Sequence, residues 1–211
     1  MNLFKRLIVQ PPLLYRALFP EALWRIKVKG AKVAFLTFDD GPVPEATPRV
    51  LEILEKYGVK ATFFMVGDNV RRYRRLYEAV KSGGHRIGNH TMHHLRGRKT
   101  SFSRYLRDVT EANEFIESDL FRPPHGLLSF RQARLIQKHY NMVMYDVVTR
   151  DYARRITPRE VVDNVRRFTR NGSIIVFHDS EKSAATTLAA LPAAIEWLLD
   201  NGFELRTLPP G

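Results

Sequence analysis

Two adjacent carboxylates, Asp39 and Asp40, follow the apolar run at residues 32–38, and their types and spacing could carry chemistry. At the end of a buried strand, neighbouring carboxylates cost desolvation and mutual repulsion unless a cation offsets them. The Asp-Gly-Pro that follows is also ordinary turn chemistry, but a turn needs only one aspartate. The second aspartate therefore favours a cation site over a simple turn.

Three histidines within the five residues of the segment HTMHH, at 90–94, form a second cluster. The four-residue spacing of His90 and His94 predicts that both imidazoles lie on one side of a helical turn and reach one ion, whereas His93 lies off that face. With Asp40 they would supply two nitrogen ligands and one carboxylate. This set is typical of a catalytic metal site, which keeps positions open for water and substrate.

Three further polar clusters follow apolar runs nearer the C-terminus. They are FRPPHG at 121–126, which contains Arg122, the segment from Asp146 to Asp151-Tyr152, and VFHD at 176–179, which contains His178. Loops are polar in any protein, so one such cluster would be unremarkable. Five of them, each at the end of a predicted strand, favour a functional site over simple solvation.

Apolar, β-rich runs alternate with helix-like segments after residue 30, and these elements must position the polar clusters. The predicted strands are Lys32–Phe38, Lys60–Val66, His85–His90, Leu120–Arg122, Met142–Val147, Ser173–Phe177 and Phe203–Leu208. Four predicted helices are Val70–Ser82, Thr100–Ser118, Ser129–Lys138 and Ala184–Asp200. Two more are predicted to begin at caps, one at Thr47 before Pro48 and one at Thr157, which fits a capping box with Glu160.

Regular alternation of strands and helices implies parallel strands joined by right-handed crossovers, in a closed barrel or an open doubly wound sheet. Seven strands in about 180 residues are few for the usual eight-stranded barrel, which needs about 250. We therefore expect a single-domain α/β fold, a distorted (β/α)7 barrel. In both architectures the carboxyl ends of the strands carry the functional loops, which is where the polar clusters fall.

Composition limits the possible functions. The 211 residues are 44% hydrophobic, enough for one compact domain, and the absence of cysteine excludes disulfides, thiolate ligands and a thiol nucleophile. The 34 Lys and Arg against 22 Asp and Glu give a net charge of +12, which favours phosphates, acidic glycans or an anionic membrane surface. No nucleic-acid motif accompanies the arginine clusters at 71–75 and 150–155, so we expect surface arginines that could steer a substrate, and no nucleic-acid partner.

The N-terminal segment resembles neither a signal peptide nor a membrane span. Lys5 and Arg6 precede a short apolar run, but the proline pair at 11–12 interrupts it and no small-residue cleavage site follows. The apolar segment at 13–24 is expected to pack on the domain, with a membrane-peripheral position as the alternative. These features predict a cytoplasmic or membrane-peripheral protein, and we expect a monomer.

The segment TFDDGP at 37–42 and the pattern His90-Thr-x-x-His94 resemble the polysaccharide deacetylases of carbohydrate esterase family 4, the NodB homology domain. The resemblance covers residues 31–208 and implies a catalytic domain over 31–211, preceded by an extension over 1–30. It also implies a distorted seven-stranded barrel and one divalent metal ion, either zinc or alternatively cobalt or nickel. The implied reaction is hydrolysis of N-acetyl or O-acetyl groups on amino-sugar glycans.

The same resemblance implies a role for each matching position. The catalytic and metal-binding positions are Asp39 as general base, His178 as general acid, Arg122 as partner of the base, Asp151 as partner of the acid, and Asp40, His90 and His94 as metal ligands. These groups fit amide hydrolysis, which needs an activated water, an oxyanion site and a protonated leaving nitrogen.

The predicted substrate-binding positions are His125, through its backbone N–H, together with Tyr152 and Val176 beside the acetyl group. The family usually has Pro-Tyr and Asp-Trp where this chain has Pro124-His125 and Asp151-Tyr152. A backbone donor tolerates the first change, whereas the second reshapes the acetate pocket. The acetylated glycan could therefore be a polymer, an oligosaccharide, or a lipid- or nucleotide-linked amino sugar.

Two other functions fit part of the pattern. An inactive carbohydrate-binding homologue would keep the fold, but it would not need both Asp39 and His178. Two histidines and a carboxylate also describe the facial triad of a non-haem iron oxygenase, which would leave Asp39, Arg122 and His178 without a role.

Overall fold

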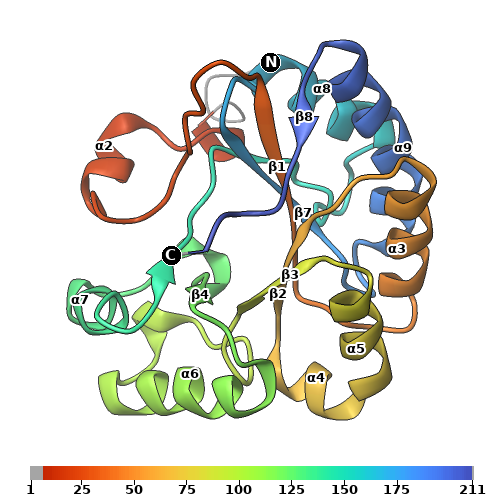
Figure 1. The fold of residues 1–211 in the computed structure, drawn as a ribbon. Helices are drawn as coiled ribbons and strands as arrows, with labels where there is room; N and C mark the ends of the chain where they lie inside the picture. The colour runs from red at the N-terminus through yellow and green to blue at the C-terminus, as the bar shows by residue number, and fades with distance from the viewer. Residues whose placement is uncertain (1–6, 211) are drawn as a thin grey trace.

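Eight short parallel strands form the centre of the molecule in the computed structural model, which describes residues 7–210 (Figure 1). The first six residues, with Lys5 and Arg6, and Gly211 lie outside the described residues. The strands are β1 Val33–Asp39, β2 Thr62–Met65, β3 Arg86–Asn89, β4 Leu120–Phe121, β5 Asn141–Met142, β6 Val147–Val148, β7 Ser173–His178 and β8 Glu204–Leu205. Their order is β5-β4-β3-β2-β1-β7-β6, with β8 also beside β1.

The two edges of this sheet belong to one stretch of chain. β5 ends at Met142 and pairs with β4, whereas β6 begins at Val147 and pairs with β7. The single strand predicted over 142–147 is therefore two short strands on opposite edges. The N-terminal segment bridges the remaining gap, because Leu23 pairs with Val143 and Arg25 with Ser173. The result is the distorted α/β barrel expected from the sequence.

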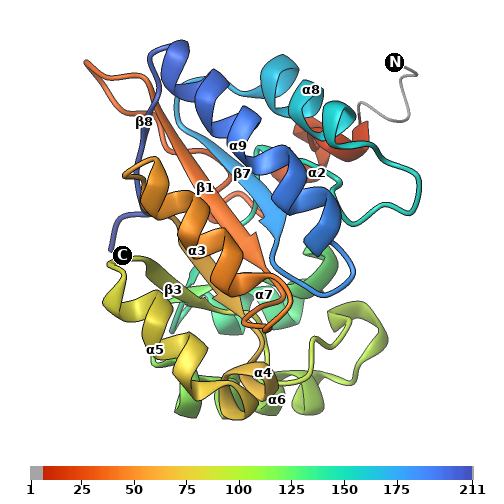
Figure 2. The ribbon, with the colours of Figure 1, turned by 90° about the vertical axis from the view of Figure 1, so that its right-hand side faces the viewer.

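Helices surround the strands on the outside (Figures 1 and 2). They are α2 Leu13–Ala17, α3 Thr47–Lys56, α4 Gly67–Arg72, α5 Arg74–Ser82, α6 Phe102–Ile116, α7 Phe130–Ile136, α8 Pro158–Phe168 and α9 Ala184–Asp200, with short 3-10 turns η1 Gly97–Lys99 and η2 Pro124–Gly126. Among residues 7–210 no helix combines the length and apolarity needed to cross a membrane.

The helix boundaries agree with some of the predicted caps and bounds and differ from others. The capping box of Thr157 with Glu160 is present at the start of α8, as predicted. The predicted cap at Thr47 is wrong, because Ala46 occupies the cap position and the Thr47 hydroxyl bonds Asp179 instead. The helix expected over 70–82 is interrupted at Tyr73, which separates α4 from α5.

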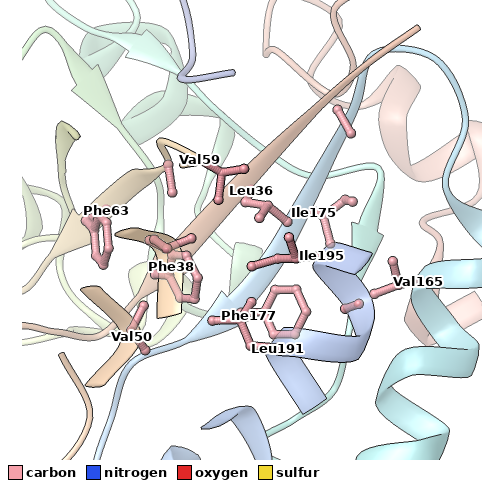
Figure 3. Close-up of a cluster of buried hydrophobic side chains, with 14 of the residues drawn as sticks. Leu36, Phe38, Val50, Val59, Phe63, Val165, Ile175, Phe177, Leu191 and Ile195 are labelled. Atoms are coloured by element: carbon pink, nitrogen blue, oxygen red, sulfur yellow. The ribbon is translucent and has the colours of Figure 1, made fainter. Parts of the chain in front are cut away.

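Alternation along the central strands decides which side chains reach the barrel interior. On β1, Leu36 and Phe38 point outward into the cluster beneath α3, α8 and α9 (Figure 3). Thr37 and Asp39 lie on the opposite face, since both accept hydrogen bonds from the interior side chain of Arg122. The apolar packing on one face thus fixes the polar residues on the other.

The N-terminal segment packs mainly through its second half. Phe19 and Trp24 are buried in a cluster with residues of α6 and α7, and the Trp24 indole donates to the Phe19 carbonyl. Leu13 and Leu14 of α2, in contrast, are 83% and 81% exposed.

Candidate active site

Strand register places the chemistry-bearing residues beside one another. Asp39 at the end of β1 is the direct partner of His178 at the end of β7. On the other side, Asn89 of β3 pairs with Phe121 of β4, so that His90 and Arg122 emerge next to each other. Because all these strands are parallel, their side chains gather at one end of the barrel.

Asp40, His90 and His94 form a cluster that could hold a metal ion. One ligand atom from each lies within 4.8 Å of the other two. The Asp40 Oδ1 is 3.1 Å from the His94 Nε2 and 3.7 Å from the His90 Nε2. Two ligands of a tetrahedral zinc ion lie about 3.3 Å apart, so both distances suit such a site.

The surroundings prepare these three residues for a cation. Burial lowers the pKa of His90 to about 4, so the imidazole is neutral at pH 7. Its Nδ1 lies 2.7 Å from the Arg122 carbonyl oxygen, which directs Nε2 towards Asp40. Burial opposes ionisation of Asp40, but the hydrogen bond with His94 and the charges of nearby histidines outweigh it and lower its pKa.

Arg122 and Asp39 form a buried ion pair. The guanidinium Nη1 donates to the Asp39 Oδ1 at 2.6 Å and to the Thr37 hydroxyl at 2.8 Å, while Nη2 donates to the Met144 carbonyl at 3.0 Å. The cation also lies 4.0 Å from the centre of the Phe64 ring. These contacts hold Arg122 in place, and Asp39 keeps one oxygen, Oδ2, that no hydrogen bond from another described residue occupies.

His178 and Asp151 form a second buried pair. The Asp151 Oδ1 lies 2.7 Å from the His178 Nδ1, and its Oδ2 accepts from the His178 backbone N–H and the Thr187 hydroxyl, both at 2.7 Å. Burial opposes protonation of His178, but Asp151 and the carboxylates of Asp40 and Asp39 outweigh it and raise its pKa to about 9. The imidazole is therefore a cation at neutral pH.

Backbone strain is concentrated around the site. Six described non-glycine residues have positive φ, among them Asp40 at 82°, His94 at 53° and His125 at 60°. Such conformations are costly for residues with a Cβ and persist where the surrounding structure imposes them. The segment at 90–94 is also not the helical turn predicted from the histidine spacing. His90 and His94 meet instead through a strained loop.

Gly41 is a position in the loop after β1 where only glycine fits. A Cβ at this position would lie 2.0 Å from the Asp179 Oδ2, so no larger residue fits. The Asp179 carboxyl accepts hydrogen bonds from the Gly41 N–H at 3.1 Å and the Thr47 hydroxyl at 2.7 Å. Burial raises the pKa of Asp179 to about 8. Asp179 thus supports the loop that presents Asp39 and Asp40.

A cavity of about 470 Å³ opens over these residues. The residues predicted to bind substrate, His125, Tyr152 and Val176, all line it. The Tyr152 ring packs edge-on against His178 at 4.9 Å between centres. Sequence reasoning missed Arg96, Tyr145 and Lys182, which also line the cavity but lie in loops without a recognisable motif.

Two residues fall outside the expected arrangement. Tyr15, far away in the sequence, donates its hydroxyl to the Gly126 carbonyl and so ties the N-terminal segment to the cavity wall. Asp146 was expected with the polar clusters at the carboxyl ends of the strands, but this is wrong. It precedes β6 and bonds Arg16, Arg170 and Ser173 at the opposite end of the barrel.

The fold and the site define an α/β-barrel hydrolase with a candidate divalent-metal centre. The pattern of the polysaccharide deacetylase family matches residues 27–145. A peptidoglycan-N-acetylglucosamine deacetylase of Bacillus cereus is 34% identical over 187 residues, covering 84% of this chain and 86% of that protein. The chain belongs to the polysaccharide deacetylase family.

Solved structures agree with this assignment. The crystal structure of the Bc1960 peptidoglycan N-acetylglucosamine deacetylase, in complex with 4-naphthalen-1-yl-N-oxidanyl-benzamide, superposes with a TM-score of 0.84 at 27% identity and covers 90% of this chain and 91% of that one. A family 4 pseudoenzyme from Bacillus anthracis also matches, with a TM-score of 0.79 at 26% identity over 88% of this chain and 66% of that one.

Proposed function

We propose that this protein removes N-acetyl groups from amino-sugar glycans, with Asp39 as general base and His178 as general acid. The observation that carries the proposal is the pairing of Asp39 with His178 at the ends of β1 and β7, beside the cluster of Asp40, His90 and His94. A base, an acid and a cation site on one cavity wall are the groups that amide hydrolysis needs.

The ligand set suits a divalent ion with nitrogen and oxygen ligands, and zinc is the first choice, with cobalt or nickel as alternatives. Asp40, His90 and His94 would hold it. When bound, the ion would polarise the attacking water and the acetyl carbonyl. A neutral His90 and an ionised Asp40 are the forms that bind a cation, and both pKa shifts favour them.

Asp39 would accept the proton of the attacking water. Its Oδ1 is held by Arg122, which fixes the carboxylate, while Oδ2 stays available for the proton. The buried guanidinium also offsets the desolvation cost of burying the Asp39 carboxylate. The base is therefore oriented before substrate binds, which reduces the reorganisation needed during reaction.

His178 would donate a proton to the departing amine. Its Nδ1 faces Asp151, so Nε2 is the nitrogen left to face the cavity. With a pKa of about 9 the imidazole carries its proton at neutral pH, as a general acid must. The backbone N–H of His125 would bind the oxyanion, and Val176 and Tyr152 would enclose the acetyl methyl group.

Retention of both buried pairs favours an active enzyme over an inactive carbohydrate-binding homologue. Asp39 with Arg122 and Asp151 with His178 are each at hydrogen-bond distance. A non-haem iron oxygenase would use the metal cluster but neither pair. Acetate release is therefore the reaction we expect.

The decisive measurement is acetate released from N-acetylglucosamine oligomers and peptidoglycan fragments by protein loaded with zinc or cobalt. Activity should disappear with a chelator and return with the metal. Absence of acetate from every N-acetylated glycan tested, with metal bound, would contradict the proposal.

Metal content tests the site independently of substrate. His90→Ala and His94→Ala should each lose most of the bound ion, whereas His139→Ala, a substitution of an exposed histidine remote from the cluster, should retain it. Unchanged metal content in both cluster variants would show that the ion binds elsewhere.

A further inference from the structure

A second cavity, of about 580 Å³, lies on the other side of the loop that carries Asp151 and Tyr152. Tyr152 faces the candidate active site, whereas its neighbours Arg150 and Ala153 line the second cavity. Charged residues dominate the wall of the second cavity: Arg150, Arg154, Arg155, Arg167, Glu160 and Asp163. One loop of a few residues therefore separates two hollows of similar size.

The four arginines of this wall form no ion pair in the part of the chain that the structure describes. Within residues 7–210, none of their guanidinium groups forms an ion pair or a side-chain hydrogen bond, whereas the exposed Arg71 and Arg72 both pair with Asp68. Of the two carboxylates in the wall, Glu160 accepts hydrogen bonds from Thr157 in the capping box of α8. The cavity wall thus has four arginines against two carboxylates, and none of the four is in an ion pair among the described residues.

Arg150 supplies the strongest sign of a missing partner. Its Nε is buried and forms no hydrogen bond with any described residue. Its backbone has a φ of 66°, in the left-handed region that disfavours a side chain. An unpaired buried donor is costly, and no internal hydrogen bond offsets that cost at this arginine, which also lines the cavity.

We propose that this second cavity binds an anionic substituent, a carboxylate or a phosphate, of the glycan whose acetylated sugar lies in the active site. This inference rests on the proposed deacetylase function. Guanidinium forks bind carboxylates and phosphates with paired hydrogen bonds, and the cavity volume suits a sugar-sized group. A glycan bound on both sides of the loop would be selected by its charge, and neutral oligomers would be poorer substrates.

Direct binding tests the cavity without turnover. Calorimetric titration with inorganic pyrophosphate compares the wild type with Arg154→Gln/Arg155→Gln and Arg150→Gln. The control is Arg159→Gln/Arg166→Gln, which removes the same charge from exposed positions of α8 outside the cavity wall. Each cavity variant should raise Kd by about tenfold or more, as the loss of charge-assisted hydrogen bonds predicts. Equal weakening in the control, or none in the cavity variants, would overturn the proposal.

Kinetics then connects the cavity to the substrate. The double variant Arg154→Gln/Arg155→Gln should raise KM by about tenfold for oligomers carrying carboxylates or phosphates and leave KM for neutral N-acetylglucosamine oligomers unchanged. Separate carboxylate and phosphate series identify the preferred anion. Acetate release from neutral oligomers with no charge-dependent difference would refute the anion site and leave the deacetylase intact. No acetate from any substrate would instead refute the proposed function.

A last experiment tests whether the second cavity binds nucleic acid. Wild-type binding of a single-stranded DNA oligonucleotide should be weak and equally sensitive to the cavity and control variants. Tighter binding than pyrophosphate, lost only in the cavity variants, would assign the cavity to nucleic acid and reject a glycan ligand.

Discussion

Two buried aspartates lie beside arginines at opposite ends of the barrel, and their environments differ. Asp146, at the amino end, accepts hydrogen bonds from Arg16, Arg170 and Ser173, and its side chain is fully buried. Asp39, at the carboxyl end, accepts one side-chain bond, from Arg122. Burial opposes ionisation of Asp146, but its hydrogen bonds with Arg170, Ser173 and Arg16 outweigh it and lower the pKa.

The difference separates a structural carboxylate from a chemically available one. Both oxygens of Asp146 accept hydrogen bonds, so this carboxylate holds the N-terminal segment and the α8–β7 connection together. Asp39 has a fixed orientation and a free oxygen, and it lines the cavity of the candidate active site. Unused hydrogen-bonding capacity that faces a cavity therefore distinguishes the ion pair of Asp39 from that of Asp146.

The largest expected effect is on catalysis at Asp39. Asp39→Asn removes the proposed proton acceptor but keeps the shape of the side chain, so kcat should fall about 10²- to 10⁴-fold. Metal content should not change, because Asp39 is outside the cluster of Asp40, His90 and His94. Acetate release and metal analysis on the same sample measure both quantities. Full activity in this variant would remove Asp39 from the role of base.

The corresponding substitution of Asp146, at the amino end of the barrel, should affect stability. Asp146→Asn leaves Arg16 and Arg170 without their carboxylate and should lower the free energy of unfolding by about 3–5 kcal/mol. Urea denaturation at pH 7 measures it, with the exposed Asp200→Asn as control. Below the unfolding transition kcat should stay near the wild-type value. A large loss of kcat without a loss of stability would erase the distinction drawn between the two aspartates.

Lowering the pH should also remove the stabilising contribution of Asp146 in the wild-type protein. The folded-state pKa of Asp146 lies below its ordinary value of 3.8, so its contribution is fully present above that pH. The contribution is lost as pH falls through the folded pKa. The stability difference between wild type and Asp146→Asn should therefore shrink below pH 3.8.

A smaller change should appear in the pH dependence of the rate. His178 has a pKa of about 9 and, in its proposed role, acts in its protonated form, so activity should fall as pH rises through about 9. Asp151→Asn removes the main favourable charge, and the alkaline limb of kcat/KM should move towards the ordinary value of 6.5. An alkaline limb that does not move would show that another group donates the proton.

Sequence patterns predicted the residues of the candidate active site better than the buried polar residues elsewhere in the barrel. The register of β1 with β7 follows from two apolar runs ending in Asp39 and His178, so their proximity was predictable. Asp146 lies inside the predicted strand Met142–Val147 and Asp151 lies after it. Because the chain breaks between β5 and β6, Asp146 instead precedes β6 and Asp151 follows it, at opposite ends of the barrel. Hydrophobic periodicity carries no signal for such a break.

Contacts that depend on tertiary structure had no sequence signal at all. Thr47 has the residue type expected of a helix cap and precedes Pro48. Its hydroxyl nevertheless donates a hydrogen bond to Asp179, 132 residues away in the sequence. The strained loop that joins His90 to His94 was predicted as a helical turn, because spacing alone cannot reveal a positive φ. In both cases a distant partner overrides the local preference of the chain.

The smallest effect is expected from a substitution in the N-terminal segment. It tests whether this segment, which is bound to Asp146, also supports the candidate active site at the carboxyl end of the barrel. Tyr15 precedes Arg16, the partner of Asp146, and its hydroxyl bonds the Gly126 carbonyl behind the cavity wall. Tyr15→Phe keeps the ring contact with Trp24 but removes a hydrogen bond worth about 0.5–1.5 kcal/mol, so kcat/KM should fall about 2- to 10-fold with metal content unchanged.

The matched control is Tyr57→Phe, which also removes a hydroxyl hydrogen bond, in this case to Glu196, but far from the cavity. Its kcat/KM should equal that of the wild type. Equal losses in the two variants would indicate a general effect of removing a tyrosine hydroxyl. The N-terminal segment is anchored by the hydrogen bond from Arg16 to Asp146. A loss confined to Tyr15→Phe would mean that this segment also positions the backbone beside His125.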